Sequence, residues 1–205
     1  MQGKELFLKN KSKIIILVIL TLIIFYKNKL IAEENPVLIE TEVRQYLMKT
    51  NEFSSNFIQT KENDFQEGNF YLKNNRFRIE YNNPSKIIII VKKNNAMYFN
   101  IDLEEVQYFN PKNTIAEVFF NMFNNSDFLN EAKFVFGLNT FSISKVFEID
   151  NQTNKIKIFF EKSPIIIRKI EFENEEGKTT FGIINANHNP NLSDDLFSLA
   201  NPLLQ

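Results

Sequence analysis

The sequence predicts a mainly β domain, in which about ten or eleven antiparallel strands form one large sheet with two or three helices to cover it. Short segments rich in β-branched and aromatic residues follow one another, separated by Asn, Pro and Lys clusters, which is typical of strands joined by hairpins. Several of these segments alternate apolar and polar residues, so one face of the sheet is apolar. With 43% hydrophobic residues, 22 Phe and only 5 Gly, the chain suits one packed domain.

The first 32 residues have the features of an export signal. A lysine-rich start precedes an unbroken apolar run at 14–26, which as a helix is about 20 Å long and shorter than the ~30 Å hydrocarbon core of a membrane. We expect cleavage after Ala32; the alternative is an uncleaved anchor. Residues 33–205 then form the folded domain.

The charge of that domain disfavours nucleic acid. Residues 1–32 hold six lysines and one glutamate out of 24 basic and 25 acidic side chains, so the remainder carries a net charge of −6. An acidic surface repels phosphate backbones and anionic lipid headgroups and so disfavours binding to them. Solubility is the simpler explanation of the charge.

Helical spacing of apolar residues appears in three places. It predicts an amphipathic helix over 36–49, a Phe-rich helix over 114–123 that Asn113 and Thr114 can cap, and a shorter helix over 127–132. We expect the first two to cover the apolar face of the sheet, because a sheet must bury such a face against another element.

The predicted strands show which side chains share that face. In 68–73 it carries Phe70 and Leu72, and in 76–82 it carries Phe77, Ile79 and Tyr81. Its area exceeds what two or three short helices can fill, so either the many Phe side chains pack the interior or a gap remains. The strands are expected at 53–61, 68–73, 76–82, 86–92, 96–101, 105–109, 142–149, 155–161, 165–173, 179–185 and 196–199.

Most enzyme chemistries are absent from the sequence. There is no Cys, and the single histidine, His188, allows neither a multi-histidine metal site nor a conventional catalytic triad. Acidic pairs fall in turns, and no glycine-rich phosphate loop occurs. We expect no enzyme activity, no metal and no cofactor.

The order of the segments resembles a known family. A Phe-x-Gln strand at 57–59 is followed by a Gly-led aromatic strand at 67–73, an aromatic strand that ends in Tyr81-Asn-Asn-Pro84, and a helix that starts at Thr114. Further on come a Glu-Gly hairpin at 176–181 and a closing segment with Leu196-Phe197 and Pro202. This series resembles the periplasmic outer-membrane lipoprotein carrier family, LolA, over most of residues 33–205.

The resemblance implies a curved antiparallel half-barrel with a helical lid over an apolar cavity for lipoprotein acyl chains. Members of this family take lipoproteins from an inner-membrane ABC exporter and pass them, through the periplasm, to an outer-membrane acceptor. By this resemblance the cavity residues are Phe70, Leu72, Phe77, Ile79 and Tyr81. We expect the carrier to act as a monomer.

The resemblance also assigns a lid, formed by the Phe-rich helix with Ile115, Phe119, Met122 and Phe123. In the family, an Arg in the turn after the Gly-led strand holds the lid to the sheet, and here Asn74 stands in that turn. An amide makes weaker hydrogen bonds than a guanidinium, so lid control is expected to differ in this chain.

Three other functions stay open at this point. The same half-barrel can serve as an envelope-stress sensor or, with an uncleaved signal, as a membrane-tethered lipid-binding domain. A hydrolase is the enzymatic alternative, against which the lack of any Ser/His/Asp grouping near His188 argues.

Overall fold

The computed structural model describes residues 36–149 and 151–204, so the expected export signal lies outside the described residues. The chain divides into two compact units, 1–39 and 40–205. Of the first unit only 36–39 are described, and they form the first turn of helix α2 (Pro36–Lys49), which has the bounds expected from the sequence. The remaining features belong to the second unit.

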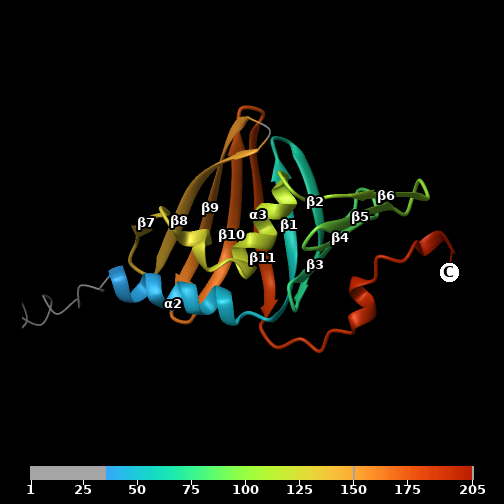
Figure 1. Ribbon diagram of the computed structural model, residues 1–205. Coiled ribbons are helices and arrows are strands. Elements are labelled where there is room, and N and C mark those ends of the chain that lie inside the picture. Colours follow the sequence, from blue (N-terminus) through green and yellow to red (C-terminus); the bar gives the residue numbers. More distant parts are fainter. Residues whose placement is uncertain (1–35, 150, 205) are drawn as a thin grey trace, which may run out of the picture. The chain divides into compact units, whose positions relative to one another are not determined.

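Eleven antiparallel strands form one curved, unclosed sheet, which confirms the predicted fold class (Figure 1). Their order is β6-β5-β4-β3-β2-β1-β11-β10-β9-β8-β7, so β1 pairs with β11 and the edges are β6 and β7. The strands are β1 (Glu52–Lys61), β2 (Asp64–Lys73), β3 (Arg76–Asn83), β4 (Ile87–Lys92), β5 (Asn95–Asn100), β6 (Glu105–Phe109), β7 (Lys133–Phe136), β8 (Thr140–Ile149), β9 (Gln152–Lys162), β10 (Ile165–Asn174) and β11 (Gly177–Asn187).

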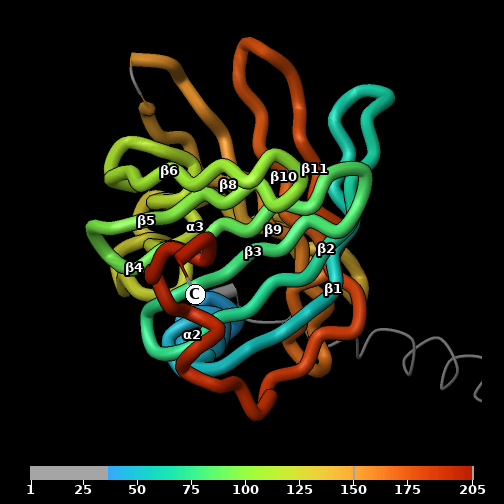
Figure 2. Tube along the Cα trace, turned by 90° about the vertical axis from the view of Figure 1, so that its right-hand side faces the viewer, coloured from blue at the N-terminus to red at the C-terminus, as the bar shows by residue number. Residues whose placement is uncertain are grey.

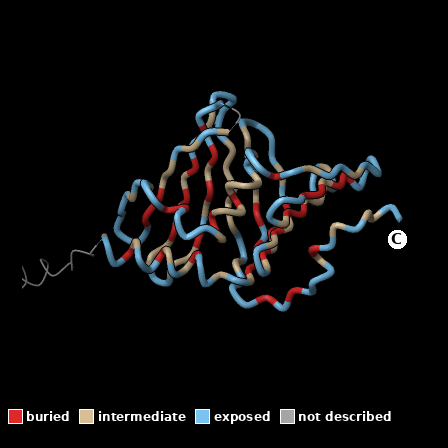
Figure 3. The backbone as a smooth tube through the Cα atoms, in the orientation of Figure 1, coloured by how far each residue is buried: buried red, intermediate tan, exposed pale blue. Residues whose placement is uncertain are grey.

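Side-chain alternation along the strands gives the sheet an apolar inner face, as the sequence predicts. In the register of β2 and β3, Phe70 lies opposite Ile79 and Leu72 lies opposite Phe77, and all four are buried. Figure 3 shows buried positions alternating with less buried ones along β9 and β10. These inner positions form the core that the helices cover.

Helix α3 (Ile115–Asn124) crosses the inner face and belongs to the connection between the two edge strands (Figure 1). It is shifted by one residue from the predicted helix. The expected helix at 127–132 is instead a single 3-10 turn, η1 (Ser126–Leu129), where Asn125 accepts a hydrogen bond from the Asp127 backbone N–H. Strand β7, which follows η1, was not predicted because its four residues are too few to show a period.

The C-terminal segment crosses the outer face of the sheet, in front of β3 to β5 in Figure 2. The predicted strand at 196–199 is wrong, because this stretch lies in and after a 3-10 turn, η2 (Asp194–Phe197). A second short turn, η3 (Pro202–Leu204), follows it. We call residues 192–199 the strap.

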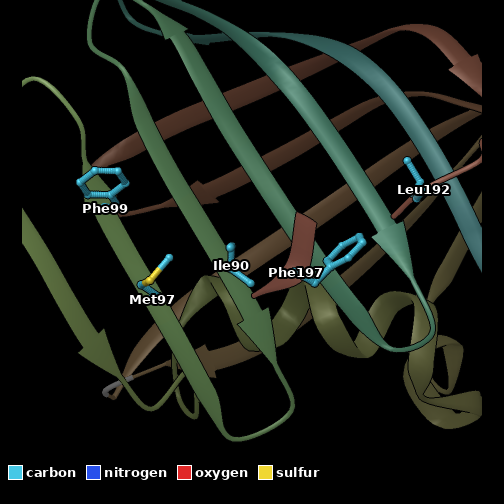
Figure 4. Close-up of a cluster of buried hydrophobic side chains, with 5 residues drawn as sticks. All are labelled: Ile90, Met97, Phe99, Leu192 and Phe197. Atoms are coloured by element: carbon cyan, nitrogen blue, oxygen red, sulfur yellow. The ribbon is translucent and has the colours of Figure 1, made fainter. Parts of the chain in front are cut away.

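The strap covers a second apolar cluster. Strand β4 has apolar residues on both faces, and on its outer face Ile90 packs with Met97, Phe99, Leu192 and Phe197 (Figure 4). Phe197 has no exposed surface. The strap is therefore the cover that the outer face of β4 and β5 needs to keep its apolar side chains from water.

Charged side chains of the β2–β3 hairpin bind the strap at its edge. Arg76 Nη2 donates to Asp194 Oδ1 at 2.6 Å, and Arg78 Nη1 donates to the Leu196 carbonyl at 2.9 Å. The hydrogen bond from Arg76 lowers the pKa of Asp194, with help from the nearby charge of Lys73. These contacts fix the position of the strap on the sheet.

The close approach of β2 to its neighbours requires glycine at position 68. A Cβ added at Gly68 would lie 1.9 Å from the Glu80 carbonyl oxygen and 2.8 Å from the Phe57 ring. We expect Gly68→Ala to lower the free energy of unfolding by about 2 kcal/mol or more, since the backbone must move apart. Urea denaturation followed by circular dichroism measures this.

The matched control is Gly182→Ala on β11. A Cβ there would lie 3.8 Å from the Ile58 carbonyl oxygen, which is ordinary van der Waals contact. The control should unfold close to the unmodified chain. Equal stability of the two variants would contradict the close approach at Gly68.

Candidate functional site

A small apolar cavity lies between α3 and the inner face of the sheet. Its volume is about 20 Å³, far below the ~150 Å³ that holds a benzene-sized ligand. The interior could be either packed by Phe side chains or left with a gap. The structure shows that the chain's own side chains nearly fill it. The lining is entirely hydrophobic: Phe53, Phe57, Phe70, Ile79, Phe119, Phe123, Ile167, Ile170, Phe181 and Ile183.

Phe119 of α3 is the centre of this filling. Its ring centroid lies 5.0 Å from that of Phe172 and 5.6 Å from that of Phe181, and the second pair is edge-to-face. On the other side it lies 6.5 Å from Phe70 and 6.4 Å from Phe77. Such pairs are favourable beyond simple burial, by roughly 0.5–1.5 kcal/mol each, so the rings fasten α3 to four strands.

The residues that the sequence assigned to a cavity lie on the inner face around this point. Phe70 and Ile79 line the cavity, while Leu72 and Phe77 are each 1% exposed in the surrounding core. Tyr81, at the end of the same row, donates a hydrogen bond to Gln59 Oε1 at 2.8 Å. Burial raises its pKa to about 12.

Of the residues assigned to the lid, three are buried, and two of these, Phe119 and Phe123, line the cavity on the sheet. Phe119, Met122 and Phe123 are buried on α3, whereas Ile115 at the start of the helix is 42% exposed. An isolated helix of ten residues is marginal in water, so α3 depends on this packing for its stability. Separating it from the sheet would uncover the three buried side chains together.

Asn74 lies in the β2–β3 turn, where it has a positive φ of 47°. Its backbone N–H donates to the Asn51 carbonyl at 2.9 Å, in the residues that follow α2. Asn tolerates this left-handed conformation better than most residues, which is a sufficient local reason for its presence. A role in holding the lid stays a prediction.

A hydrogen bond near the end of α3 comes from Arg44 on α2. Its Nη1 donates to the Ser126 carbonyl at 2.9 Å, and its Nε and Nη2 donate to Glu40 Oε1 at 3.1 and 2.8 Å. The guanidinium thus connects α2 to the turn that follows α3. Sequence reasoning missed this residue: the Glu40–Arg44 spacing was visible, but nothing in it indicates a partner 82 positions away.

Comparison with known sequences identifies the family. The model of the family described as "Outer membrane lipoprotein carrier protein LolA" matches residues 48–200. The chain belongs to the LolA family. This confirms the resemblance, and with it a family of carrier and binding proteins that is periplasmic and not enzymatic. No curated protein matches the chain closely enough to count as a relative.

Comparison with solved structures finds similar chains at low sequence identity. An uncharacterized conserved protein from Thermus thermophilus has a TM-score of 0.51 and 9% identity, covering 78% of this chain and 90% of its own. The MucA/MucB complex of Pseudomonas aeruginosa has a TM-score of 0.43 and 11% identity, covering 80% and 60% respectively. One chain in the structure of the CwlD amidase from Clostridioides difficile in complex with the GerS lipoprotein has a TM-score of 0.41 and 14% identity, with 78% of this chain and 96% of that chain covered.

His188 stands against the rings of Tyr46 and Phe53, with centroids 5.4 and 5.1 Å away. Burial lowers the pKa of His188, because the partly buried ring loses hydration that favours its charged form. Over 36–149 and 151–204 we find no group of His, Cys, Asp and Glu side chains that could hold a metal ion. Nor does any helix in those ranges have the length and hydrophobicity to cross a membrane.

Alkaline pH tests the burial of the two core tyrosines. The pKa of Tyr81 and of Tyr46 is raised by burial to about 12, against roughly 10 when unfolded. Between these values the folded chain holds more protons than the unfolded chain, so the free energy of unfolding should fall as pH rises. Urea denaturation between about pH 10 and 12 measures the slope.

Tyr81→Phe should remove a large part of that slope, since one of the two raised groups is gone. Tyr46→Phe is the comparison, and the two single variants together should account for most of the fall. A Tyr81→Phe chain with the unmodified slope would show that the Tyr81 hydroxyl is not buried in the folded state.

Proposed function

We propose that this protein is a periplasmic carrier that shields lipoprotein acyl chains on the inner face of its sheet and moves lipoproteins from the inner to the outer membrane. An inner-membrane ABC exporter would supply the lipoprotein and an outer-membrane acceptor would receive it, with the carrier acting as a monomer. The observation that supports this most is the entirely apolar lining of the cavity under α3. Membership of the LolA family supports it independently.

Acyl chains need such a site because their exposure to water during transfer between membranes is very unfavourable. Each methylene that leaves water gains about 0.8 kcal/mol, so a chain of about fourteen carbons gains on the order of 10 kcal/mol. The inner face offers a comparable environment once α3 moves away from it, and the lining contributes no polar group that would oppose a hydrocarbon.

The closed lid sets the affinity. A cavity of about 20 Å³ admits no acyl chain, so binding must displace α3 and break the ring contacts of Phe119. The free energy of opening subtracts from the free energy of ligand binding, because only the open state binds. A carrier that holds its ligand weakly in this way can release it to a better acceptor without an energy source at that step.

Filling the cavity tests whether the inner face binds hydrocarbon. Ile183 lines the cavity, and its neighbour Ile184 lies on the outer face of β11, 39% exposed. We expect Ile183→Trp to lose most binding of a fluorescent apolar dye and of a dipalmitoylated peptide, because the indole occupies the space, at a stability cost of about 1–3 kcal/mol. Ile184→Trp, the matched control, should bind as the unmodified chain does.

Native mass spectrometry of the full chain, isolated from cells without detergent, tests the natural cargo. A mass increment equal to one or more acylated lipoproteins supports the carrier. Isolation without any such increment, together with failure of the purified chain to bind the dipalmitoylated peptide, would contradict it. A bound non-acylated protein would favour the stress-sensor function.

Arg44 offers a test of the lid mechanism. Removing its hydrogen bond to the Ser126 carbonyl should make opening easier, and a charged hydrogen bond contributes about 1.5 kcal/mol. Arg44→Ala is then expected to bind the dipalmitoylated peptide up to about tenfold more tightly, with faster amide hydrogen exchange in 115–129. Arg168→Ala, which breaks an exposed pair with Glu161, is the control; equal affinity of the two variants would contradict the mechanism.

A further inference from the structure

A second pocket, of about 230 Å³, lies between α3 and β8. It touches a different stripe of the helix from the apolar cavity: Thr114, Val118, Asn121 and Asn125 line it, whereas Phe119 and Phe123 line the cavity. We call it the lateral pocket. Unlike the cavity, it already exceeds the ~150 Å³ that holds a benzene-sized ligand.

Lys145 of β8 is the unusual residue of this pocket. The inner positions before it on the strand, Phe141 and Ile143, are each 2% exposed, and its partner across β9 is Ile156 at 1%. By alternation Lys145 belongs to the same apolar row. Lys145 is itself half-buried, so this row of apolar side chains ends in a charged group at the wall of the lateral pocket.

The contacts of Lys145 leave part of its hydrogen-bonding capacity unused. Its Nζ donates to the Phe128 carbonyl at 2.9 Å and lies 5.7 Å from the centre of the Phe128 ring. An ammonium group has three N–H donors. Asn121, facing the same pocket, makes no side-chain hydrogen bond within the described part of the chain.

The charges around Lys145 indicate what kind of ligand suits the pocket. Glu117, Asp127 and Glu148 also line it, so the lining has a net negative charge. Glu117 accepts from the Asn113 backbone N–H at 2.7 Å, and Asp127 accepts from an Asn side chain at 3.1 Å. This balance opposes a phosphate, and a polar group without negative charge fits it if it offers carbonyl oxygens to the lysine and N–H groups to the acceptors.

We propose that the lateral pocket binds the polar head of an acylated peptide, namely the ester and amide groups that join the acyl chains to its first residue. This proposal rests on the carrier function. Lys145 donates to the carbonyl oxygens of those groups, and Asn121 bonds to the adjoining peptide. The acyl chain itself occupies the space under α3. A single helix thus separates the site for the head from the site for the tail.

Lys145→Met tests the proposal, because methionine keeps the length of the side chain and removes the charge. We expect affinity for a dipalmitoylated cysteinyl peptide to fall about tenfold, the effect of losing a charged hydrogen bond, while the apolar dye 1-N-phenylnaphthylamine binds unchanged. Asn121→Leu should weaken the same peptide and spare the dye. Lys157→Met, whose Nζ lies 4.7 Å from the Phe159 ring on the outer face, is the control and should change neither.

The outcomes separate the two proposals. If the unmodified chain binds neither dye nor peptide, the carrier function itself is overturned. If it binds both, and Lys145→Met binds the peptide as tightly as Lys157→Met does, the lateral pocket is not the site of the head. If Lys145→Met loses as much affinity for hexadecyl phosphate, which has no carboxylic ester or amide group, as for the peptide, the assignment to ester and amide groups is wrong, because the lysine then binds an anion.

Discussion

The packing of Phe119 and its neighbours against the inner face is the interaction on which the rest of the structure depends. A single helix of ten residues covers the centre of an eleven-stranded sheet, so it must bury large side chains to keep that face from water. The same rings hold the space that a hydrocarbon would need. In the proposed carrier, core packing and binding of an acyl chain therefore compete for one surface, and the stability of the empty protein limits how tightly it can bind.

The two faces of the sheet are covered in different ways. Over the centre of the inner face the cover is a helix held chiefly by apolar rings, with one arginine hydrogen bond to the turn beyond it. On the outer face the strap combines a fully buried Phe197 with charged hydrogen bonds from Arg76 and Arg78. Contacts with fixed donor and acceptor geometry specify one position, whereas apolar contacts tolerate displacement, so α3 is the better suited of the two covers to move.

The sheet and its inner face could be predicted from the sequence, because the alternation of apolar and polar residues along a strand is a local signal. Phe70, Leu72, Phe77 and Ile79 could be placed on one face from their spacing alone, and the helix over 36–49 from its period. The same reasoning mistook 196–199 for a strand, since a few apolar residues that cover an outer face look like a strand that completes it. The contact of Arg44 with Ser126 and the pocket around Lys145 depend on which segments meet in three dimensions. The spacing of residues along the chain does not predict such contacts.

Because α3 borders both the apolar cavity and the lateral pocket, its displacement changes both at once. A tail that enters under the helix pushes away the wall that Asn121 provides for the head, and a head held by Lys145 and Asn121 resists that movement. The two parts of one ligand then bind with a coupling free energy set by the helix, and the sign of that coupling depends on how far the helix must travel. If both proposals hold, an acylated peptide that satisfies both sites with a small displacement would be favoured over a bare fatty acid, which supplies only the tail, and selection of cargo would follow from the geometry of one helix.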